Sequence, residues 1–385
     1  MWGSRFSGQA SPVYTTPMRS IEETSGRPPS AHLRQNSTVE WTARAPGHHP
    51  RRLMPPQPTS DPEVITLGET LVDLFLVGLN EHWGVEPRTG GAPGNVASGL
   101  AELGHDVASV SRIGADPMGA LAVASLRLAG VNTRWIQYDN VRPTTLAVVS
   151  PPDSHGGFTI YLQGSASAHI SETDLPFPQI AAARVLHVGS LSMASPISRS
   201  ATRTAIAYAR ASGALISLDV NLRPSCWPSA IPMVRAAVEL IEFADVVKLT
   251  ADEASILGHR GGSALHSGTR VVLTTDGGRE AHLTVAGHTV TRTPPHVDVV
   301  DPTGAGDAFL AMFLHRLLTD VPRGTALQDV PNDFWADALA TSVGAGSAAV
   351  QRTGASRLLP SLASVLAVLD ELGDPKKGVP AATTR

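Results

Sequence analysis

The sequence predicts an α/β fold with a mainly parallel central sheet, helices on both faces of that sheet and a small β-sheet lid. From residue 183 onward, strand-like segments alternate with segments of helical periodicity, which is typical of βαβ units. Two glycine-rich segments each follow a strand-like segment and precede a helical one. Earlier in the chain, the proline- and glycine-rich residues 150–157 join two strand-like stretches, which indicates a hairpin outside the main sheet.

The spacing of apolar residues predicts the individual elements. The predicted strands of the main sheet are residues 64–73, 107–113, 185–188, 215–220, 246–249 and 270–274, with a pair near 281–293. The hairpin strands are residues 144–149 and 158–162. The predicted helices are 196–212, 230–243, 332–350 and 360–372, together with helices that end at Gly104 and near Gly130. Because ligands bind at the carboxyl ends of parallel strands, we expect the functional residues there.

The chain divides into one folded domain and two polar ends. The first sixty residues are rich in Pro, Ser, Thr and Arg and lack apolar periodicity, so we expect disorder there. Their basic composition faintly resembles a transit peptide, and Met54 offers the alternative of a start just before the domain. The expected boundaries are 1–60 for the disordered extension, 61–373 for the domain, about 74–90 and 134–166 for its lid, and 374–385 for a polar tail.

Composition limits the class of protein. A net charge of −4 and a pI near 6.4 argue against nucleic acid or an anionic membrane as a partner. The single cysteine, Cys226, excludes an intrachain disulfide, and no apolar run approaches the length of a membrane span. Lysine occurs only at 248, 376 and 377, none of them after a Gly-x-x-x-x-Gly segment, so there is no Walker A loop. We therefore expect a cytoplasmic enzyme.

Residues 301–307 read Asp-Pro-Thr-Gly-Ala-Gly-Asp and precede an apolar helical segment. Val297–Val300 predict the end of a buried strand, so the glycines lie between a strand and a helix N-terminus. Such a junction binds anions through unpaired N–H groups and the positive end of the helix dipole. Asp307 then lies beside the anion. This position fits a general base for a hydroxyl that attacks a phosphoryl group, with an ordinary helix cap as the alternative.

Residues 90–97 form the second glycine-rich segment, Gly-Gly-Ala-Pro-Gly-Asn-Val-Ala. Consecutive glycines let the backbone approach a ligand closely, and Asn95 can donate and accept hydrogen bonds with sugar hydroxyls. A plain loop that leads into a helix is the alternative. Residues 219–223 add Asn221 and Arg223 after an acidic strand end, which supplies hydrogen bonds and a cation for phosphate.

These segments resemble the signatures of the ribokinase-like, phosphofructokinase-B-type carbohydrate kinases. Residues 90–97 are similar to the amino-terminal signature and residues 301–309 to the carboxy-terminal one, in the family's order and about 210 residues apart. The resemblance covers about residues 62–372 and implies a ribokinase-like three-layer sandwich. Further segments resemble the fructokinase branch: residues 68–73, 187–192, 219–224 and 227–228.

The resemblance also implies roles for single residues. Asp307 is the implied catalytic base, and the backbone N–H groups of Gly304, Ala305 and Gly306 form the implied anion hole. The implied sugar contacts are Asp73, Gly90, Gly91, Asn95 and Asp307. The implied nucleotide contacts are Thr250, Asn221, Arg223, Thr275, Gly277, Gly304 and Gly306. For Asp73, a surface carboxylate at a strand end is the alternative.

The implied cofactors are ATP and Mg²⁺, with K⁺ as a monovalent cation in some relatives. Residues 248–253 resemble the family's Asn-x-x-Glu element, with Thr250 in place of the asparagine. Glu253 would hold Mg²⁺ through water, since Mg²⁺ keeps much of its hydration shell. A solvated acid at a helix start is the alternative reading of Glu253. Asp301 and Thr303, with backbone from 345–355, match the place where some relatives bind a monovalent cation.

The sequence departs from the fructokinase-like pattern at positions that bear on the substrate. The lid strand of relatives often carries an arginine and then an aspartate where this chain has Leu162 and Ser167. On the adenine side, Val343 replaces a frequent asparagine. The motif therefore predicts phosphoryl transfer more strongly than it predicts fructose.

We expect ATP-dependent phosphorylation of a primary hydroxyl of a small sugar, with fructose as the best single substrate. Ribose, 2-keto-3-deoxygluconate and a nucleoside are the alternatives within the class. A non-catalytic sugar or nucleotide sensor is an alternative from another class, although the base and the anion hole are intact. A dinucleotide-dependent oxidoreductase is disfavoured because no Gly-x-Gly-x-x-Gly follows the first strand. The expected partners are the small molecules alone, without nucleic acid or membrane, and a second copy held through the lid.

Overall fold

The computed structural model describes residues 57, 60–79, 82–150, 158–266 and 271–351. Most of the segment predicted to be disordered, the helix predicted at 360–372 and the tail at 374–385 lie outside the described residues. Among the described residues, no helix is both long enough and apolar enough to cross a membrane.

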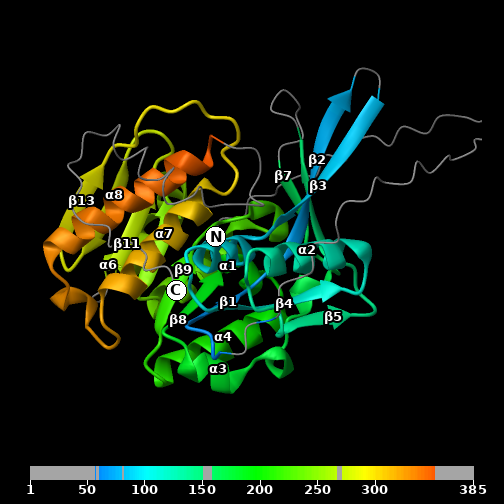
Figure 1. Ribbon diagram of the computed structural model, residues 1–385, viewed down its shortest axis with the longest axis horizontal. Helices are drawn as coiled ribbons and strands as arrows, with labels where there is room; N and C mark the ends of the chain where they lie inside the picture. The colour runs from blue at the N-terminus through cyan, green and yellow to red at the C-terminus, as the bar shows by residue number, and fades with distance from the viewer. Residues whose placement is uncertain (1–56, 58–59, 80–81, 151–157, 267–270, 352–385) are drawn as a thin grey trace, which may run out of the picture. The chain divides into compact units, whose positions relative to one another are not determined.

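A nine-stranded sheet forms the centre of the domain (Figure 1). Its strand order is β13-β12-β11-β10-β9-β8-β1-β4-β5. Adjacent strands from β11 to β5 run parallel, whereas β12 and β13 are antiparallel at one edge. The strand bounds are β1 (Val64–Leu67), β4 (Val107–Gly114), β5 (Ile136–Asp139), β8 (Val185–Gly189), β9 (Leu215–Asp219), β10 (Val246–Thr250), β11 (Val271–Thr275), β12 (Ala281–Val285) and β13 (His288–Arg292).

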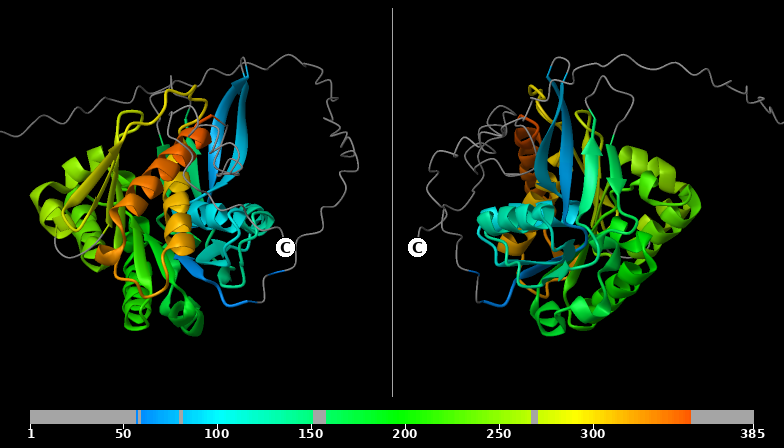
Figure 2. Two further views of the ribbon diagram at one scale, coloured as in Figure 1. Left: turned by 60° about the vertical axis from the view of Figure 1, so that its left-hand side comes forward. Right: turned by 90° about the vertical axis from the view of Figure 1, so that its right-hand side faces the viewer.

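A separate four-stranded sheet has the order β3-β2-β6-β7 and stands away from the main sheet (Figure 2). Its strands are β2 (Leu71–Leu79), β3 (His82–Gly90), β6 (Thr145–Val149) and β7 (Phe158–Tyr161). β2 and β6 run parallel, and the two outer pairs are antiparallel. The chain enters this sheet directly from the carboxyl end of β1, so the small sheet begins where we expect ligands to bind.

Helices cover both faces of the main sheet and complete the three layers (Figures 1 and 2). On one face α7 packs against both α1 and α8, and on the other α3 packs against α4 and α5 against α6. The helix bounds are α1 (Ala92–Glu102), α2 (Pro117–Leu128), α3 (Phe177–Ala182), α4 (Pro196–Ala211), α5 (Ala230–Phe243), α6 (Ala251–His266), α7 (Ala305–Asp320) and α8 (Asn332–Ala349). Short 3₁₀ helices occur at Ala166–His169, Glu172–Asp174, Ser190–Ala194, Pro224–Cys226 and Leu327–Asp329.

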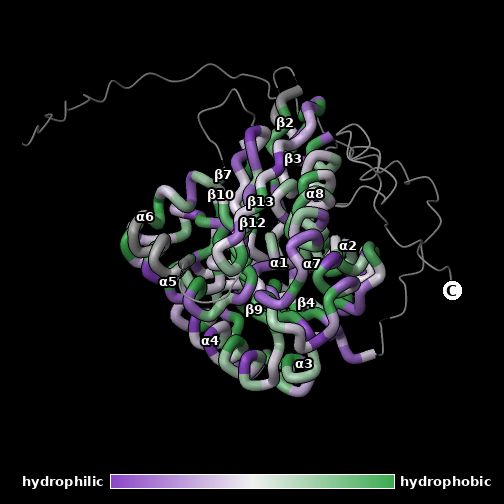
Figure 3. The backbone as a smooth tube through the Cα atoms, turned by 90° about the vertical axis from the view of Figure 1, so that its left-hand side faces the viewer, coloured by the Kyte–Doolittle hydropathy of each residue, from purple (hydrophilic) through white to green (hydrophobic). Residues whose placement is uncertain are grey.

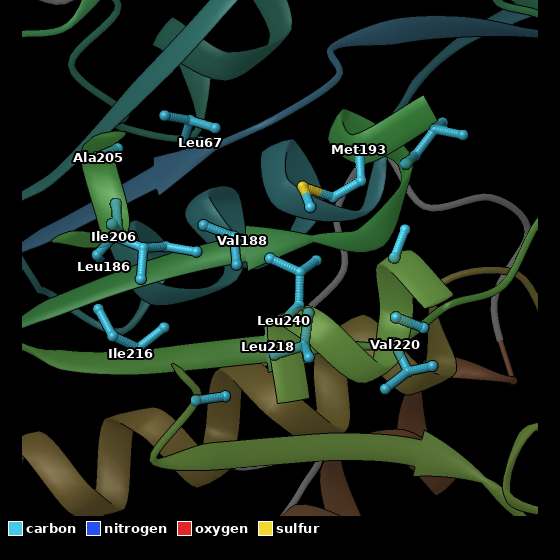
Figure 4. Close-up of a cluster of buried hydrophobic side chains, with 14 of the residues drawn as sticks. Leu67, Leu186, Val188, Met193, Ala205, Ile206, Ile216, Leu218, Val220 and Leu240 are labelled. Carbon is cyan, nitrogen blue, oxygen red and sulfur yellow. The ribbon is translucent and has the colours of Figure 1, made fainter. Parts of the chain in front are cut away.

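Alternate residues of the buried strands supply the two hydrophobic layers. In β1, Val64 packs on the side of α1 and α7, whereas Ile65 and Leu67 pack on the side of α4 and α5. Figure 4 shows the second layer, where Leu186 and Leu218 of neighbouring strands lie beside residues of α4 and α5. Hydropathy mapped on the backbone shows hydrophobic segments in the interior, around β4 and β9 (Figure 3). This rigid sandwich fixes the ends of the central strands.

The structure corrects three predictions about the elements. Val297–Val300 are not a buried strand but an irregular segment in which Val299 and Val300 are exposed. The single strand predicted at 64–73 is two strands, because the chain turns at residues 68–70 from the main sheet into the lid. Residues 134–166 were predicted to belong to the lid. Within this range, β5 instead joins the edge of the main sheet beside β4.

Candidate active site

A cavity of about 820 Å³ lies between the small sheet and the carboxyl ends of the main-sheet strands. This volume lies within the range usual for small-molecule sites. Four successive strands contribute residues at or near their carboxyl ends to its wall: Gly189, Asp219, Thr250 and Thr275. On the lid side, Phe158 and Ile160 of β7 line it. The location agrees with the expectation that ligands bind at strand ends in parallel sheets.

The turn before α7 presents its backbone to this cavity. Gly304 has a left-handed φ of 82° and precedes the first helical residue, Ala305. The N–H group of Ala305 lies 3.3 Å from the carbonyl oxygen of Pro302, so this donor helps close the turn. A side chain on Gly306 would place its Cβ 2.7 Å from Nζ of Lys248. The residues implied as an anion hole therefore line the cavity at a helix N-terminus, and Gly306 leaves room for a buried ammonium group.

Asp307 lies in the first turn of α7 and joins the two glycine-rich segments. The side-chain amide of Asn95 in α1 donates a hydrogen bond of 2.8 Å to Oδ2 of Asp307, across 212 residues of sequence. Loss of solvation, together with repulsion by Asp219, raises the pKa of Asp307 to about 6. A carboxylate with that pKa is ionised at neutral pH and accepts a proton readily.

Lys248 lies directly beneath the turn, and sequence analysis assigned it no role. Its ammonium group is 3.2 Å from each carboxylate oxygen of Asp219, and both side chains are almost completely buried. Burial lowers the pKa of Lys248, but attraction by Asp219 and Asp307 outweighs this and raises it. Its sequence signal was one charged residue within the otherwise mainly apolar strand Val246–Thr250. Its nearness to Gly306 depends on the fold and has no local sequence signature.

Two further carboxylates, Glu69 and Asp73, line the cavity close enough to Asp307 for its charge to act on both. Burial raises the pKa of each to about 7, with repulsion by Asp307 adding to the effect at Asp73. Within the described part of the chain, Oε2 of Glu69 and Oδ1 of Asp73 are buried without a hydrogen-bond partner. Asp73 was a predicted sugar contact, and Glu69 was noted only as part of the resemblance.

The predicted glycines of the first signature have different places. Gly91 lines the cavity with φ 102°, and a Cβ there would come within 2.4 Å of the carbonyl oxygen of Glu69. Gly90 is absent from the cavity wall, and a Cβ on it would lie 2.2 Å from Oδ2 of Asp73. Gly90 therefore leaves room for the Asp73 carboxylate rather than forming the wall itself.

The predicted nucleotide residues converge on the cavity. Thr250, Asn221, Arg223, Thr275 and Gly277 all line it. Asn221 has a left-handed φ of 37°, and the guanidinium carbon of Arg223 lies 5.5 Å from the ring centroid of Phe158 in the lid. Val343 of α8 also lines the wall, where it contributes an apolar surface without hydrogen-bonding groups.

Glu253 does not line the cavity. Its two carboxylate oxygens accept hydrogen bonds from the backbone N–H groups of Leu222 (2.6 Å) and Thr250 (2.8 Å). These bonds hold the 219–223 loop against the start of α6, so the carboxylate does not fit direct coordination of Mg²⁺. Among the described residues, no group of three or more His, Cys, Asp or Glu side chains is arranged to hold a metal ion.

Of the predicted cation residues, Thr303 lines the cavity, and its N–H group donates to Oδ1 of Asp301 at 2.9 Å. Oδ2 of Asp301 lies 3.6 Å from Nη1 of Arg88, a lid residue. The proposed backbone ligands after residue 351 lie outside the described residues.

The two departures in and after the lid strand, Leu162 and Ser167, do not reach the cavity. Leu162 is buried in the hydrophobic core, and Ser167 donates to the carbonyl oxygens of Thr70 (3.3 Å) and Arg112 (3.2 Å). Both residues therefore lie behind the cavity wall. In β7 the residues that line the cavity are instead Phe158 and Ile160.

Comparisons with known proteins agree with this site. The pfkB family carbohydrate kinase profile matches residues 61–362. A protein of Arabidopsis thaliana named "Probable fructokinase-5" is 31% identical over 313 residues, which are 78% of this chain and 95% of that protein. The chain belongs to the pfkB family of carbohydrate kinases, which are phosphotransferases.

Solved structures give the same result. The fructokinase of Xylella fastidiosa with bound ATP superposes with a TM-score of 0.76 at 28% identity, over 81% of this chain and 99% of that one. A fructokinase double mutant from Vibrio cholerae, crystallised with fructose, ADP and a potassium ion, gives 0.70 at 29% identity, over 80% and 99%. The predicted ribokinase-like fold is thereby confirmed.

Proposed function

We propose that this enzyme transfers the γ-phosphoryl group of ATP to a primary hydroxyl of a small sugar, with fructose as the first candidate. The observation that carries the proposal is the hydrogen bond between Asn95 and Asp307. It unites both glycine-rich segments around one carboxylate at a helix N-terminus. The ligands named for the Xylella and Vibrio fructokinases support ATP and fructose as the pair.

In the proposed reaction, Asp307 accepts the proton of the sugar hydroxyl while that oxygen forms a bond to the γ-phosphorus. The bond between the γ-phosphorus and the bridging oxygen breaks, and ADP leaves with the electron pair. The N–H groups of Gly304, Ala305 and Gly306 would face the phosphoryl group, with that of Ala305 shared with the carbonyl oxygen of Pro302, and such oriented donors stabilise developing charge. Lys248 contributes positive charge beneath Gly306 and lowers the pKa of Asp307. These residues would catalyse mainly by position and electrostatics.

The sugar is assigned to the end of the cavity that holds Glu69, Asp73 and Asn95. The unpartnered oxygens of the two acids are hydrogen-bond acceptors that sugar hydroxyls would satisfy. The nucleotide is assigned to the end lined by Asn221, Arg223 and Gly277. Mg²⁺ would arrive on the nucleotide phosphates and neutralise part of their charge. Glu253 would influence it only through water, because its own oxygens hold two backbone amides.

A panel of acceptors tests the proposed function. ADP release is measured with Mg²⁺ and ATP and with D-fructose, D-ribose, 2-keto-3-deoxygluconate or adenosine. We expect turnover with one acceptor far above the others, and fructose to be that acceptor. Preferred turnover of another sugar or of adenosine would change the substrate and keep the reaction. ATP binding without turnover of any acceptor would favour the non-catalytic sensor.

Two further expectations belong to this proposal. A reaction that consumes ATP fits a cytoplasmic enzyme, which cell fractionation checks.

A homodimer through the lid fits the exposed apolar side chains of its strands, Val77, Val85, Phe158 and Tyr161. Light scattering of the purified protein, with Val85→Asp as the disrupting variant, checks the second expectation.

A further inference from the structure

Arg88 is a cation from the lid that reaches the turn before α7. It lies in β3 directly opposite Asp73 of β2, so both side chains are on the same face of the small sheet. The guanidinium carbon is 4.4 Å from the ring centroid of Phe75. Nε and Nη2 contact the two carboxylate oxygens of Glu86 at 3.3 and 3.1 Å. These contacts fix the plane of the guanidinium and direct Nη1 away from Glu86.

Nη1 of Arg88 lies next to the carboxylate of Asp301 without a hydrogen bond to it. The distance to Oδ2 is 3.6 Å, and the two side chains are only 15% and 11% exposed. Oδ1 of the same carboxylate accepts the N–H group of Thr303. The backbone N–H of Asp301 donates to the carbonyl oxygen of Val350, which follows α8. Asp301 is thus held inside the turn that leads to Gly304 and Asp307.

By the resemblance to the family, Asp301 and Thr303, with backbone from 345–355, match the place where some relatives bind a monovalent cation. Such an ion needs a shell of oxygen ligands, of which Asp301 supplies the anionic one. In this chain the guanidinium of Arg88 already lies beside Oδ2 of Asp301. Its contacts with Phe75 and Glu86 in the lid hold it there. A second cation at the same carboxylate would be repelled by the guanidinium, although the Glu86 carboxylate offsets part of that charge. Among the described residues, the carboxylate of Asp301 therefore does not fit a bound monovalent ion.

We propose that Arg88 supplies, from within the chain, the positive charge that a monovalent cation supplies in some relatives. This inference rests on the proposed kinase function of the same site. It follows that the enzyme works without K⁺. Since the charge is carried by a lid strand, the turn before α7 is also linked to the position of the lid. Arg88 is a positioning residue: it acts on the anion hole through Asp301 and does not contact the reacting atoms.

The test compares potassium chloride with tetramethylammonium chloride at equal ionic strength. Melting temperature and ATP affinity by calorimetry are measured together with turnover, so the result does not depend on the acceptor sugar. The variants are Arg88→Ala, Arg88→Gln and Arg88→Lys. Arg142→Ala is the matched control, because Arg142 also pairs with an aspartate, Asp139, at the edge of the main sheet away from the cavity.

For the wild-type protein, all three quantities should be the same in both salts. In tetramethylammonium, Arg88→Ala and Arg88→Gln should bind ATP roughly tenfold more weakly. Potassium should restore this affinity and raise their melting temperature by about 2–4 °C. Arg88→Lys should remain insensitive to potassium, and Arg142→Ala should behave as the wild type does in this comparison.

Two results would overturn the inference. One is a wild-type protein whose melting temperature or ATP affinity depends on potassium. The other is that Arg88→Ala and Arg88→Gln respond to potassium no more than the wild type does. This result would count against the inference even if both variants had lost ATP affinity. An absence of turnover with every acceptor would instead count against the proposed function, since melting temperature and ATP affinity still report on Arg88.

Discussion

The proposed phosphate end and sugar end of the cavity, which meet at the Asn95–Asp307 hydrogen bond, differ in how their polar groups are satisfied. At the phosphate end, Lys248 is paired with Asp219, and Asp307 accepts a hydrogen bond from Asn95. At the sugar end, Glu69 and Asp73 each keep a buried oxygen without a partner among the described residues. A buried acceptor without a partner costs free energy, which a ligand donor recovers. In the proposed assignment, the catalytic groups are therefore positioned before the ligands bind, whereas the sugar completes the hydrogen bonding of its own site.

The largest effect is expected from Asp307→Asn. The variant keeps the shape of the phosphate end but removes the proposed base, so turnover should fall by ~10²–10⁴. ATP affinity, measured by calorimetry, should remain close to that of the wild type. Asp320→Asn at the opposite end of α7 is the matched control and should retain full turnover. Near-normal turnover of Asp307→Asn would show that Asp307 is not the catalytic base.

Lys248→Met breaks the paired state of the phosphate end. It leaves the Asp219 carboxylate buried without its counter-ion, which should lower the free energy of unfolding by ~3–5 kcal/mol. Urea denaturation measures this loss. The double variant Asp219→Asn, Lys248→Met should recover much of it, because no charge is then left unpaired. Equal stability of the single and double variants would show that the pair does not matter in this way.

Asp73→Asn tests the sugar end. Here the expected change in the free energy of unfolding has the opposite sign to that of Lys248→Met. The folded state holds a proton on Asp73 up to a pKa of about 7, while the unfolded chain loses it near 3.8. This group therefore stabilises the fold less and less as pH rises from about 4 through 7. The variant should be more stable than the wild type by roughly 1–3 kcal/mol at pH 8 and about equal to it at pH 4.

The same variant should raise the KM for the sugar about tenfold while changing the KM for ATP little. Thermal denaturation at both pH values and steady-state kinetics provide the two measurements. A variant that loses stability at pH 8 would contradict the idea that the sugar end is unsatisfied without its ligand.

The smallest effects are expected from the lid wall. Ile160 lines the cavity and Leu162, two residues later, is buried behind it. Ile160→Met should change the ratio of kcat/KM between two sugars by up to about tenfold. Leu162→Met should leave that ratio unchanged and cost less than ~1.5 kcal/mol of stability. Competition between fructose and ribose measures the ratio, and an equal change in both variants would show that Leu162 influences the sugar pocket.

Much of the fold followed from local patterns. The alternation of apolar strands and amphipathic helices after residue 183 predicted β8 to β11 with small errors at the ends. The prediction of a buried strand end at Val297–Val300 was wrong. The same apolar spacing occurs there in an exposed segment, and periodicity alone does not report burial. β5 was placed in the lid because a short strand carries no mark of the sheet that it joins.

The site was predictable where its chemistry lies within one motif. Residues 301–307 and 90–97 both reach the cavity, because each motif spans a turn between regular elements. Lys248 and Arg88 were not predictable in the same way. Lys248 meets Gly306, and Arg88 meets Asp301, only because strands far apart in sequence end at the same place.

The central claim is that Asp307 is the proton acceptor at a prebuilt phosphate end. The most direct measurement is the pH dependence of kcat/KM for the wild-type enzyme between pH 5 and 8. Because the base must be ionised and its pKa is raised to about 6, kcat/KM should increase with pH through an ionisation near that value, while Glu69 and Asp73 titrate separately near 7. The residual activity of Asp307→Asn should lack this ionisation. A wild-type profile that is flat across this range, or a variant that keeps the same ionisation, would contradict the account.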